Sequence, residues 1–401
     1  MAVTFIHTAD WQIGKPFGGF DARLAGRLEA ARLDAIDRIG EAARERGASF
    51  VIVAGDVYDS TDLAERTLRQ PLERMRAFAD LTWFLIPGNH DYAARNGLWH
   101  RLVQSVSLPA NVRALVEPRP EPVPGHAAVI LPAPLTARAL AHDPTAWMDD
   151  CATDPGLCRI GLAHGAVHGF GGSGETSVLI DPGRVARAHL EYLALGDWHG
   201  TKEVAPRCWY SGTPEPDNFA ASQKGFALAV GIDGPGAAAK VTPVATGHFV
   251  WARLKARVGS VRDLDAVSRE IAEFTDRPQR LLLTLAVQGA LPVADYEAFA
   301  AWSGDLAARL QHAEIATDEL VIEADGDGIA ALDVLAGAPE LQAVARRLIA
   351  IRDGSGGLPA ADTVVSELLA LRDTAITPEA VASSALVKLI RAARAEAEGS
   401  L

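Results

Sequence analysis

The sequence contains no apolar run approaching the roughly 20 residues that a membrane-spanning helix requires. Its first residues, MAVTFIHTAD, lack the basic segment and the long apolar stretch of a signal peptide. Only three cysteines occur, and their spacing fits neither a disulfide framework nor a zinc knuckle. We therefore expect a cytoplasmic protein with reduced thiols and no membrane partner.

The chain also lacks positive net charge, because 38 Lys and Arg face 51 Asp and Glu, a balance of −13 at pH 7. This balance argues against a protein that coats nucleic acid non-specifically, since such binding depends on many cationic contacts with phosphates. A nuclease is not excluded, because it needs only a local basic surface. The 401 residues, 49% of them hydrophobic, predict a folded chain of two or three domains.

Short apolar runs alternate with helical patterns from residue 3 to about residue 230. Apolar periodicity predicts helices over residues 21–46 and 62–78, the second kinked or divided at Pro71. Buried strands that alternate with helices predict a layered α/β domain. Functional side chains collect at strand ends in such sheets, and Gly, Asp, Asn or His ends each of the runs VTFIHTAD, SFVIVAGD, TWFLIPGNHD, RIGLAHG and YLALGDWH.

Three segments follow from these patterns. We expect a first domain over residues 1–245, a small βαβαβ domain over residues 246–330 and a helical segment over residues 331–401. The helical segment has apolar stripes, one of which comprises Leu341, Val344, Leu348 and Ile351. Such a stripe either packs on its own domain or offers an apolar surface to a partner.

Five ordered motifs contain residues suited to metal chemistry: Asp10-Trp11-Gln12, Gly55-Asp56, Gly88-Asn89-His90-Asp91, His164-Gly165 and Gly196-Asp197-Trp198-His199. Together they resemble the calcineurin-like metallophosphoesterases. The stretches HTADW, YLALGDWHG and WYSGTPEPDNFAASQKGFALAV further resemble the SbcD-type DNA repair exonuclease subunit family. The resemblance implies an α/β fold: a four-layer α-β-β-α sandwich, a small α/β capping domain and a helical C-terminal tail.

The resemblance also implies two divalent metal ions, which together hold the attacking and leaving oxygens of a phosphoryl displacement. Asp56 would bridge them. The ligands would be Asp10, Gln12, Asp56 and His199 at a first position, and Asp56, Asn89, His164 and Asp197 at a second position. His90 would donate a proton to the leaving oxygen, and Asp91 would orient the ring of His90.

The sequence departs from this family at two ligands. The usual Asp-x-His is Asp10-x-Gln12 here, and the usual Gly-His-x-His is Gly196-Asp197-x-His199. Each change replaces an imidazole nitrogen by an oxygen donor, and oxygen-rich sites suit Mn²⁺ or Mg²⁺ better than zinc. We therefore expect an altered, active site that prefers Mn²⁺, with Mg²⁺ as the second choice. A degenerate, catalytically silent site is the alternative.

The pattern VWARLKARV predicts a strand that places Trp251, Arg253, Lys255 and Arg257 on one face. Basic groups beside an aromatic ring suit a DNA backbone, and a solvated strand face is the alternative. We expect a two-metal DNA exonuclease within a repair complex. Its expected partners are DNA and an SbcC-like ATPase docked on the C-terminal helices, and a homodimer is compatible with this assembly. A phosphodiesterase for nucleotides or phospholipids and a silent scaffold are the rival functions.

Overall fold

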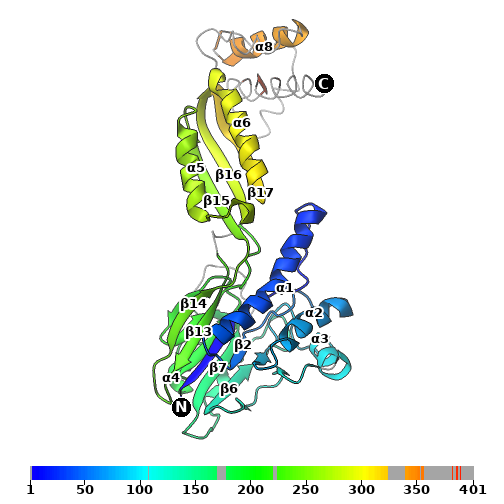
Figure 1. Cartoon of the computed structure of the whole chain (residues 1–401), viewed down its shortest axis with the longest axis vertical. Coiled ribbons are helices and arrows are strands. Elements are labelled where there is room, and N and C mark those ends of the chain that lie inside the picture. Colours follow the sequence, from blue (N-terminus) through cyan, green and yellow to red (C-terminus); the bar gives the residue numbers. More distant parts are fainter. Residues whose placement is uncertain are drawn as a thin grey trace. The chain divides into compact units, whose positions relative to one another are not determined.

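The computed structural model describes residues 2–106, 108–168, 178–219, 224–323, 339–352, 354–355, 382, 385–386 and 389. The chain divides into two compact units, residues 1–251 and residues 252–401 (Figure 1). Helices and parallel strands occur in both units, which confirms the predicted α/β class. Within the described ranges, no helix has both the length and the apolar character needed to cross a lipid bilayer.

The first unit contains two six-stranded sheets. The first sheet has the order β14-β13-β1-β2-β3-β4, with bounds Lys240–Ala245, Phe226–Ile232, Val3–Thr8, Phe50–Val53, Thr82–Leu85 and Val112–Ala114. The second has the order β11-β12-β10-β7-β6-β5, with bounds Lys202–Ala205, Cys208–Tyr210, Tyr192–Gly196, Cys158–His164, Ala128–Ala133 and Glu121–Pro122. A separate pair consists of β8 (Ala166–Val167) and β9 (Leu179–Ile180).

The central strands of both sheets are parallel, so their carboxyl ends lie at the same edge of each sheet. In the first sheet, Val53 of β2 pairs with Thr8 of β1 and with Leu85 of β3. In the second sheet, His164 of β7 pairs with Gly196 of β10. Most of the predicted metal ligands occupy or directly follow these strand ends, as expected for parallel sheets.

Apolar side chains join the two sheets face to face. One cluster of buried residues combines Phe5 and Phe50 of the first sheet with Ile160 and Tyr192 of the second. The rings of Phe5 and Phe50 are stacked with centroids 5.0 Å apart, and Tyr192 meets Phe5 edge-on at 5.7 Å. Such close packing lets few alternative arrangements persist, so this core fixes the carboxyl ends of the two sheets relative to each other.

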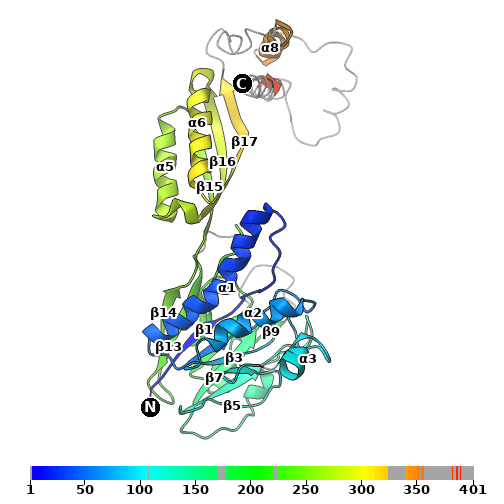
Figure 2. The same cartoon turned by 45° about the vertical axis from the view of Figure 1, so that its right-hand side comes forward.

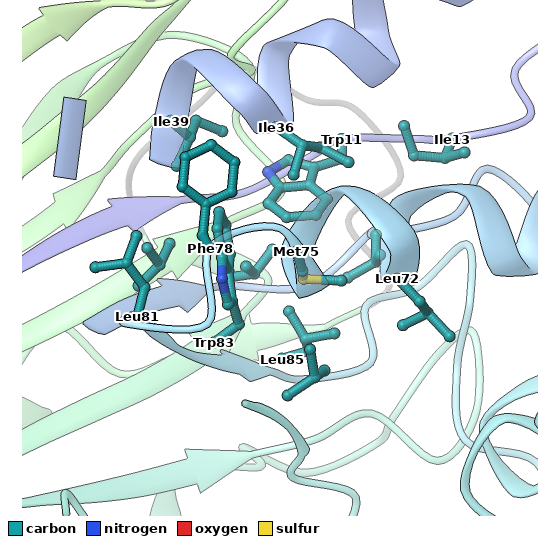
Figure 3. Close-up of a cluster of buried hydrophobic side chains, with 14 of the residues drawn as sticks. Trp11, Ile13, Ile36, Ile39, Leu72, Met75, Phe78, Leu81, Trp83 and Leu85 are labelled. Atoms are coloured by element: carbon teal, nitrogen blue, oxygen red, sulfur yellow. The ribbon is translucent and has the colours of Figure 1, made fainter. Parts of the chain in front are cut away.

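Helices α1 (Ala22–Glu45) and α2 (Glu65–Arg76) cover the other face of the first sheet. The carboxylate of Asp21 caps α1 by accepting from the N–H groups of its first turn. Helix α2 is one helix through Pro71, so the predicted division there is wrong; burial of the ring offsets the lost hydrogen bond. Figure 3 shows the cluster that these helices cover, with Trp11, Ile13, Ile36, Ile39, Leu72, Met75, Phe78, Leu81, Trp83 and Leu85.

Short elements complete the first unit. Helix α3 (Leu98–Arg101) runs into a π-helical turn, η1 (Leu102–Val106). The 3-10 turn η2 (Ala146–Met148) and helix α4 (Arg184–Arg187) contribute Met148 and Val185 to a cluster with Leu193 and Leu195 of β10. These elements therefore pack on the second sheet.

The second unit has the element order β-α-β-α-β. Its sheet, β15-β16-β17, contains Val250–Val258, Leu281–Pro292 and His312–Glu323, and β16 and β17 are parallel. Helices α5 (Asp263–Phe274) and α6 (Val293–Arg309) lie on one face of this sheet (Figure 2), and the 3-10 turn η3 (Pro278–Arg280) precedes β16. Helix α8 (Pro339–Arg352) follows. Most of the remaining predicted helical segment lies outside the described residues.

Candidate metal centre

Four predicted ligands meet at the carboxyl ends of the strands. Nε2 of His164 lies 3.3 Å from Oδ1 of Asn89, 3.5 Å from Oδ1 of Asp56 and 3.8 Å from Oδ1 of Asp197. Nδ1 of His164 donates to the carbonyl oxygen of Ala54 at 2.8 Å, which leaves Nε2 directed at the three side-chain oxygens. These are the four residues that were predicted as ligands at the second position, and they come from both sheets.

Asp10 extends this cluster toward the first position. One ligand atom each from Asp10, Asp56 and His164 lies within 4.8 Å of the other two, and all three residues are buried. The carboxylate of Asp10 also accepts from the backbone N–H of Asp197, at 3.1 Å and 3.3 Å for its two oxygens. The bond ties the loop after β1 to the loop after β10 and thus links the two sheets at the site.

Buried negative charge shifts the pKa values of these groups. Burial raises the pKa of Asp10 to about 6, with a further contribution from neighbouring carboxylates. Burial opposes the protonation of His164, but Asp56, Asp10 and Asp197 outweigh it and raise its pKa to about 9. Burial likewise raises the pKa of Asp197. A divalent cation neutralises such an excess of buried carboxylate, so the donor set fits a metal ion.

The backbone at the site adopts the left-handed conformation at residues other than glycine. The φ angles are 56° at Asp10, 45° at Gln12, 51° at Asp56 and 102° at Asp197. Such residues cost on the order of 1–3 kcal/mol each and persist where their surroundings fix them. The loops after three strands are therefore held in strained conformations that direct carboxylates into one place.

Gly88 permits a close approach to Asp56. A Cβ at this position would lie 2.1 Å from Oδ1 and 2.4 Å from the backbone nitrogen of Asp56. We expect Gly88→Ala to displace that carboxylate and to weaken Mn²⁺ binding by more than about 10-fold in calorimetric titrations. In the control Gly26→Ala, the new Cβ meets nothing within 4 Å, so binding should stay unchanged. Equal affinities for the two variants would contradict the assigned role of Asp56.

His90 lies beside the cluster, but its ring is oriented by a group that the sequence did not indicate. Nδ1 of His90 lies 3.0 Å from the carbonyl oxygen of Asp59, and its backbone N–H donates to Oδ1 of Asp56 at 3.0 Å. Asp91 was predicted to orient this ring. Its two carboxylate oxygens instead accept from the backbone N–H groups of Gly88, at 2.6 Å, and Tyr58, at 3.1 Å. Asp91 thus holds the loop after β3, and burial together with Asp56 raises its pKa to about 8.

Gln12 and His199, the other two ligands predicted for the first position, contact a polar cluster of Lys15, Arg32 and Asp217. Oε1 of Gln12 accepts from Nζ of Lys15 at 3.3 Å and from Nη2 of Arg32 at 3.4 Å. Nδ1 of His199 lies 3.6 Å from Oδ1 of Asp217. Burial lowers the pKa of His199, but Asp217 outweighs burial and raises it.

The sequence did not indicate Lys15, Arg32 or Asp217 as site residues. The carboxylate of Asp217 is 2% exposed and lies 2.5 Å from Nζ of Lys15 and 3.6 Å from Nη2 of Arg32. Burial opposes its ionisation, but His199 and the two cations outweigh burial and hold its pKa well below the usual range. The stretch TPEPDNF around Asp217 belonged to the family resemblance, but no spacing rule distinguishes this carboxylate from Glu215.

The predicted DNA-contacting strand is β15. Arg253, Lys255 and Arg257 are exposed and alternate with buried residues along it. Trp251 is only 1% exposed and does not share this exposed face, because its ring packs against Phe17, Phe20 and Phe219. A ring enclosed in this way offers no surface on which a base can stack, so only the three basic side chains remain for that role.

Two facing sheets with a buried carboxylate and histidine cluster at their strand ends define a metal-dependent hydrolase. Residues 3–200 match the family described as calcineurin-like phosphoesterase. The predicted superfamily is thereby confirmed, whereas the SbcD-type family stays a prediction. No curated protein matched the sequence.

One solved structure similar to the chain is the crystal structure of the protein TT1561 of Thermus thermophilus. The identity is 12% and the TM-score 0.38, with coverage of 61% of this chain and 100% of that chain. Similarity at this level supports no conclusion about activity.

Proposed function

We propose that this chain hydrolyses DNA phosphodiester bonds with two divalent ions and serves as the nuclease subunit of a DNA repair complex. Metal-dependent phosphoester hydrolysis follows from the superfamily and the buried group of Asp10, Asp56 and His164. The main support for a preference for manganese is the donor set, in which side-chain oxygens surround a single imidazole at the second position.

The side chains at the site have separate tasks in this reaction. When bound, the ions supply hydroxide at neutral pH and stabilise charge on the phosphate oxygens. Asp10, Asp56 and Asp197 provide carboxylate ligands on loops that the two sheets hold rigidly. The Asp59 carbonyl fixes the ring of His90 through Nδ1, which leaves Nε2 as the atom that gives a proton to the leaving oxygen.

The exposed side chains of Arg253, Lys255 and Arg257 supply the local basic surface that DNA needs on an acidic chain. Phosphate contacts of this kind position the strand without reading its sequence. They distinguish a DNA-directed diesterase from one for nucleotides or phospholipids, which encloses its substrate in a pocket.

We expect simultaneous replacement of Arg253, Lys255 and Arg257 by glutamine to lower cleavage of linear DNA by about 10-fold or more. The salt dependence of DNA binding should weaken by a slope of roughly 0.9 per lost contact. Turnover of bis-p-nitrophenyl phosphate, measured in the same manganese buffer, should not change. The matched control replaces three other exposed arginines of the second unit by glutamine: Arg262, Arg269 and Arg277.

Three outcomes decide between the functions. The proposal is supported if the triple variant of Arg253, Lys255 and Arg257 loses DNA cleavage and the arginine control does not. If the unmodified chain left DNA uncut but hydrolysed a nucleotide or phospholipid diester, its substrates would be small molecules. No hydrolysis of any diester with manganese supplied would identify a silent scaffold.

We also propose an SbcC-like ATPase as the partner of the C-terminal helices. In α8, Leu341 and Leu348 pack in a small cluster with Leu386, whereas Val344 is 48% exposed. We expect Val344 to be part of the apolar surface that contacts this partner.

A further inference from the structure

The polar cluster of Lys15, Arg32 and Asp217 lies beside Gln12, the residue that stands where the family usually has a histidine ligand. Arg32 extends from α1, is 3% exposed, and donates to three oxygens: the carbonyl of Trp11 at 3.0 Å, the carbonyl of Glu215 at 3.1 Å and Oε1 of Gln12 at 3.4 Å. Its guanidinium is therefore fixed in place. Lys15 reaches the same Gln12 oxygen from the loop after β1.

Lys15 and Arg32 both donate to the Gln12 oxygen, and one carboxylate lies close to both of them. Asp217 is the carboxylate that contacts Lys15 and Arg32. The carboxylate of the neighbouring Glu215 is held by Arg38 at 2.8 Å and by the backbone N–H groups of His248 and Phe249. The Gln12 oxygen thus accepts from two cationic groups, so its lone pairs are directed at positive charge, while the carboxylates of Asp10 and Asp59 interact with Arg32 from other directions.

A metal ion on the Gln12 oxygen would share that atom with two cations. The separation between the ion and each cation could not exceed one coordination bond plus one hydrogen bond, so repulsion would oppose binding. The second position instead faces carboxylates, because Asp56 and Asp197 both lie close to Nε2 of His164. The two positions therefore differ in charge as well as in donor atoms.

We propose that the two ion positions are unequal, and that Lys15 and Arg32 provide at the first position part of the charge that an ion would otherwise supply. The second position binds its ion tightly. The first fills only at higher ion concentration, through Asp10 and His199, whose Nδ1 is directed at Asp217. This inference rests on the metal site of the proposed function and concerns ion occupancy rather than substrate.

The test is a titration of the full-length chain with Mn²⁺, followed by calorimetry and by electron paramagnetic resonance, which detects coupled ion pairs. We expect one tight equivalent and a second that binds at least about 10-fold more weakly. Lys15→Met removes one cation and should strengthen the weaker ion by about 10-fold without changing the tight one. Gln12→His supplies a neutral imidazole and should also reduce the difference between the two Mn²⁺ affinities. This second variant provides the test if Lys15→Met does not fold.

The matched control is Lys240→Met on β14, where the lysine pairs with Asp233 at 2.9 Å. It should leave both affinities unchanged. Two equivalents of equal affinity in the unmodified chain would overturn the inference, as would a weak ion that neither Lys15→Met nor Gln12→His strengthens. Unequal ions in a chain that cuts no DNA would refute the proposed function instead, and equal ions in a chain that cuts DNA would refute only this inference.

Discussion

Replacement of Asp56 by asparagine is expected to lower phosphodiester hydrolysis by more than about 1,000-fold, which corresponds to about 4 kcal/mol at 1.4 kcal/mol per decade. Asp56 is the carboxylate assigned to both ion positions, and its removal leaves each position short of charge. Asparagine keeps the shape of the side chain and tolerates the φ of 51° at this residue. It can still accept from the backbone N–H of His90, so the loop should stay folded.

The measurement combines metal content by mass spectrometry with turnover of bis-p-nitrophenyl phosphate in manganese buffer. Asp80→Asn is the control, because this carboxylate is 54% exposed and pairs with Arg44 at the surface. The control should retain its metal and its activity. A variant at position 56 with full metal content and full turnover would show that Asp56 does not hold the ions.

Replacement of His90 by glutamine is expected to leave metal content unchanged and to lower DNA cleavage by about 100-fold to 10,000-fold, the usual contribution of a general acid. The expected loss is small for bis-p-nitrophenyl phosphate, because nitrophenolate leaves without a proton. This split between leaving groups separates a lost proton donor from a damaged metal site. Single-turnover cleavage of labelled linear DNA provides the rate.

The control for this variant is His100→Gln on α3, where the histidine is exposed. It should cleave both substrates at the rate of the unmodified chain. Equal losses on DNA and on the nitrophenyl ester would mean that His90 holds the site together rather than donating a proton. Full activity of the His90→Gln variant on DNA would show that His90 takes no part in the reaction.

Much of the site could be predicted because strand ends leave a simple signature in the sequence. Apolar runs that stop at Asp, Gly, Asn or His correspond to β1, β2, β3, β7 and β10, and parallel pairing brings these ends together. That arrangement places Asp56, Asn89, His164 and Asp197 at neighbouring strand ends, and the family resemblance selected these four as one ligand set. Family resemblance supplied the pairing of motifs between the two sheets, since periodicity alone does not state which sheet faces which.

The contacts that orient the ligands could not be predicted, because they depend on loop backbone and on residues distant in sequence. The carbonyl of Asp59 holds His90, while Asp91 binds two backbone N–H groups instead. A carbonyl group belongs to every residue and leaves no mark in a sequence pattern. The burial of Trp251 was missed for a related reason: alternation along β15 assigns faces but does not show that three phenylalanine rings enclose one end of the strand.

The Gln12 substitution illustrates the same limit. The sequence shows that an amide replaces the usual imidazole, which allowed the expectation of an oxygen ligand. It does not show that Lys15 and Arg32 donate to this oxygen, because Arg32 lies 20 residues away on α1. The structure thus explains why the first position should bind its ion less tightly than a comparison of donor atoms suggests.

Anomalous diffraction from crystals of the full-length chain soaked in Mn²⁺ tests the central claim most directly, because it locates the ion without reference to any substrate. The account predicts a strong manganese peak coordinated by Asp56, Asn89, His164 and Asp197, with a weaker peak beside Asp10 and His199. A map with no manganese peak within coordination distance of Asp56 and His164 at saturating Mn²⁺ would contradict it.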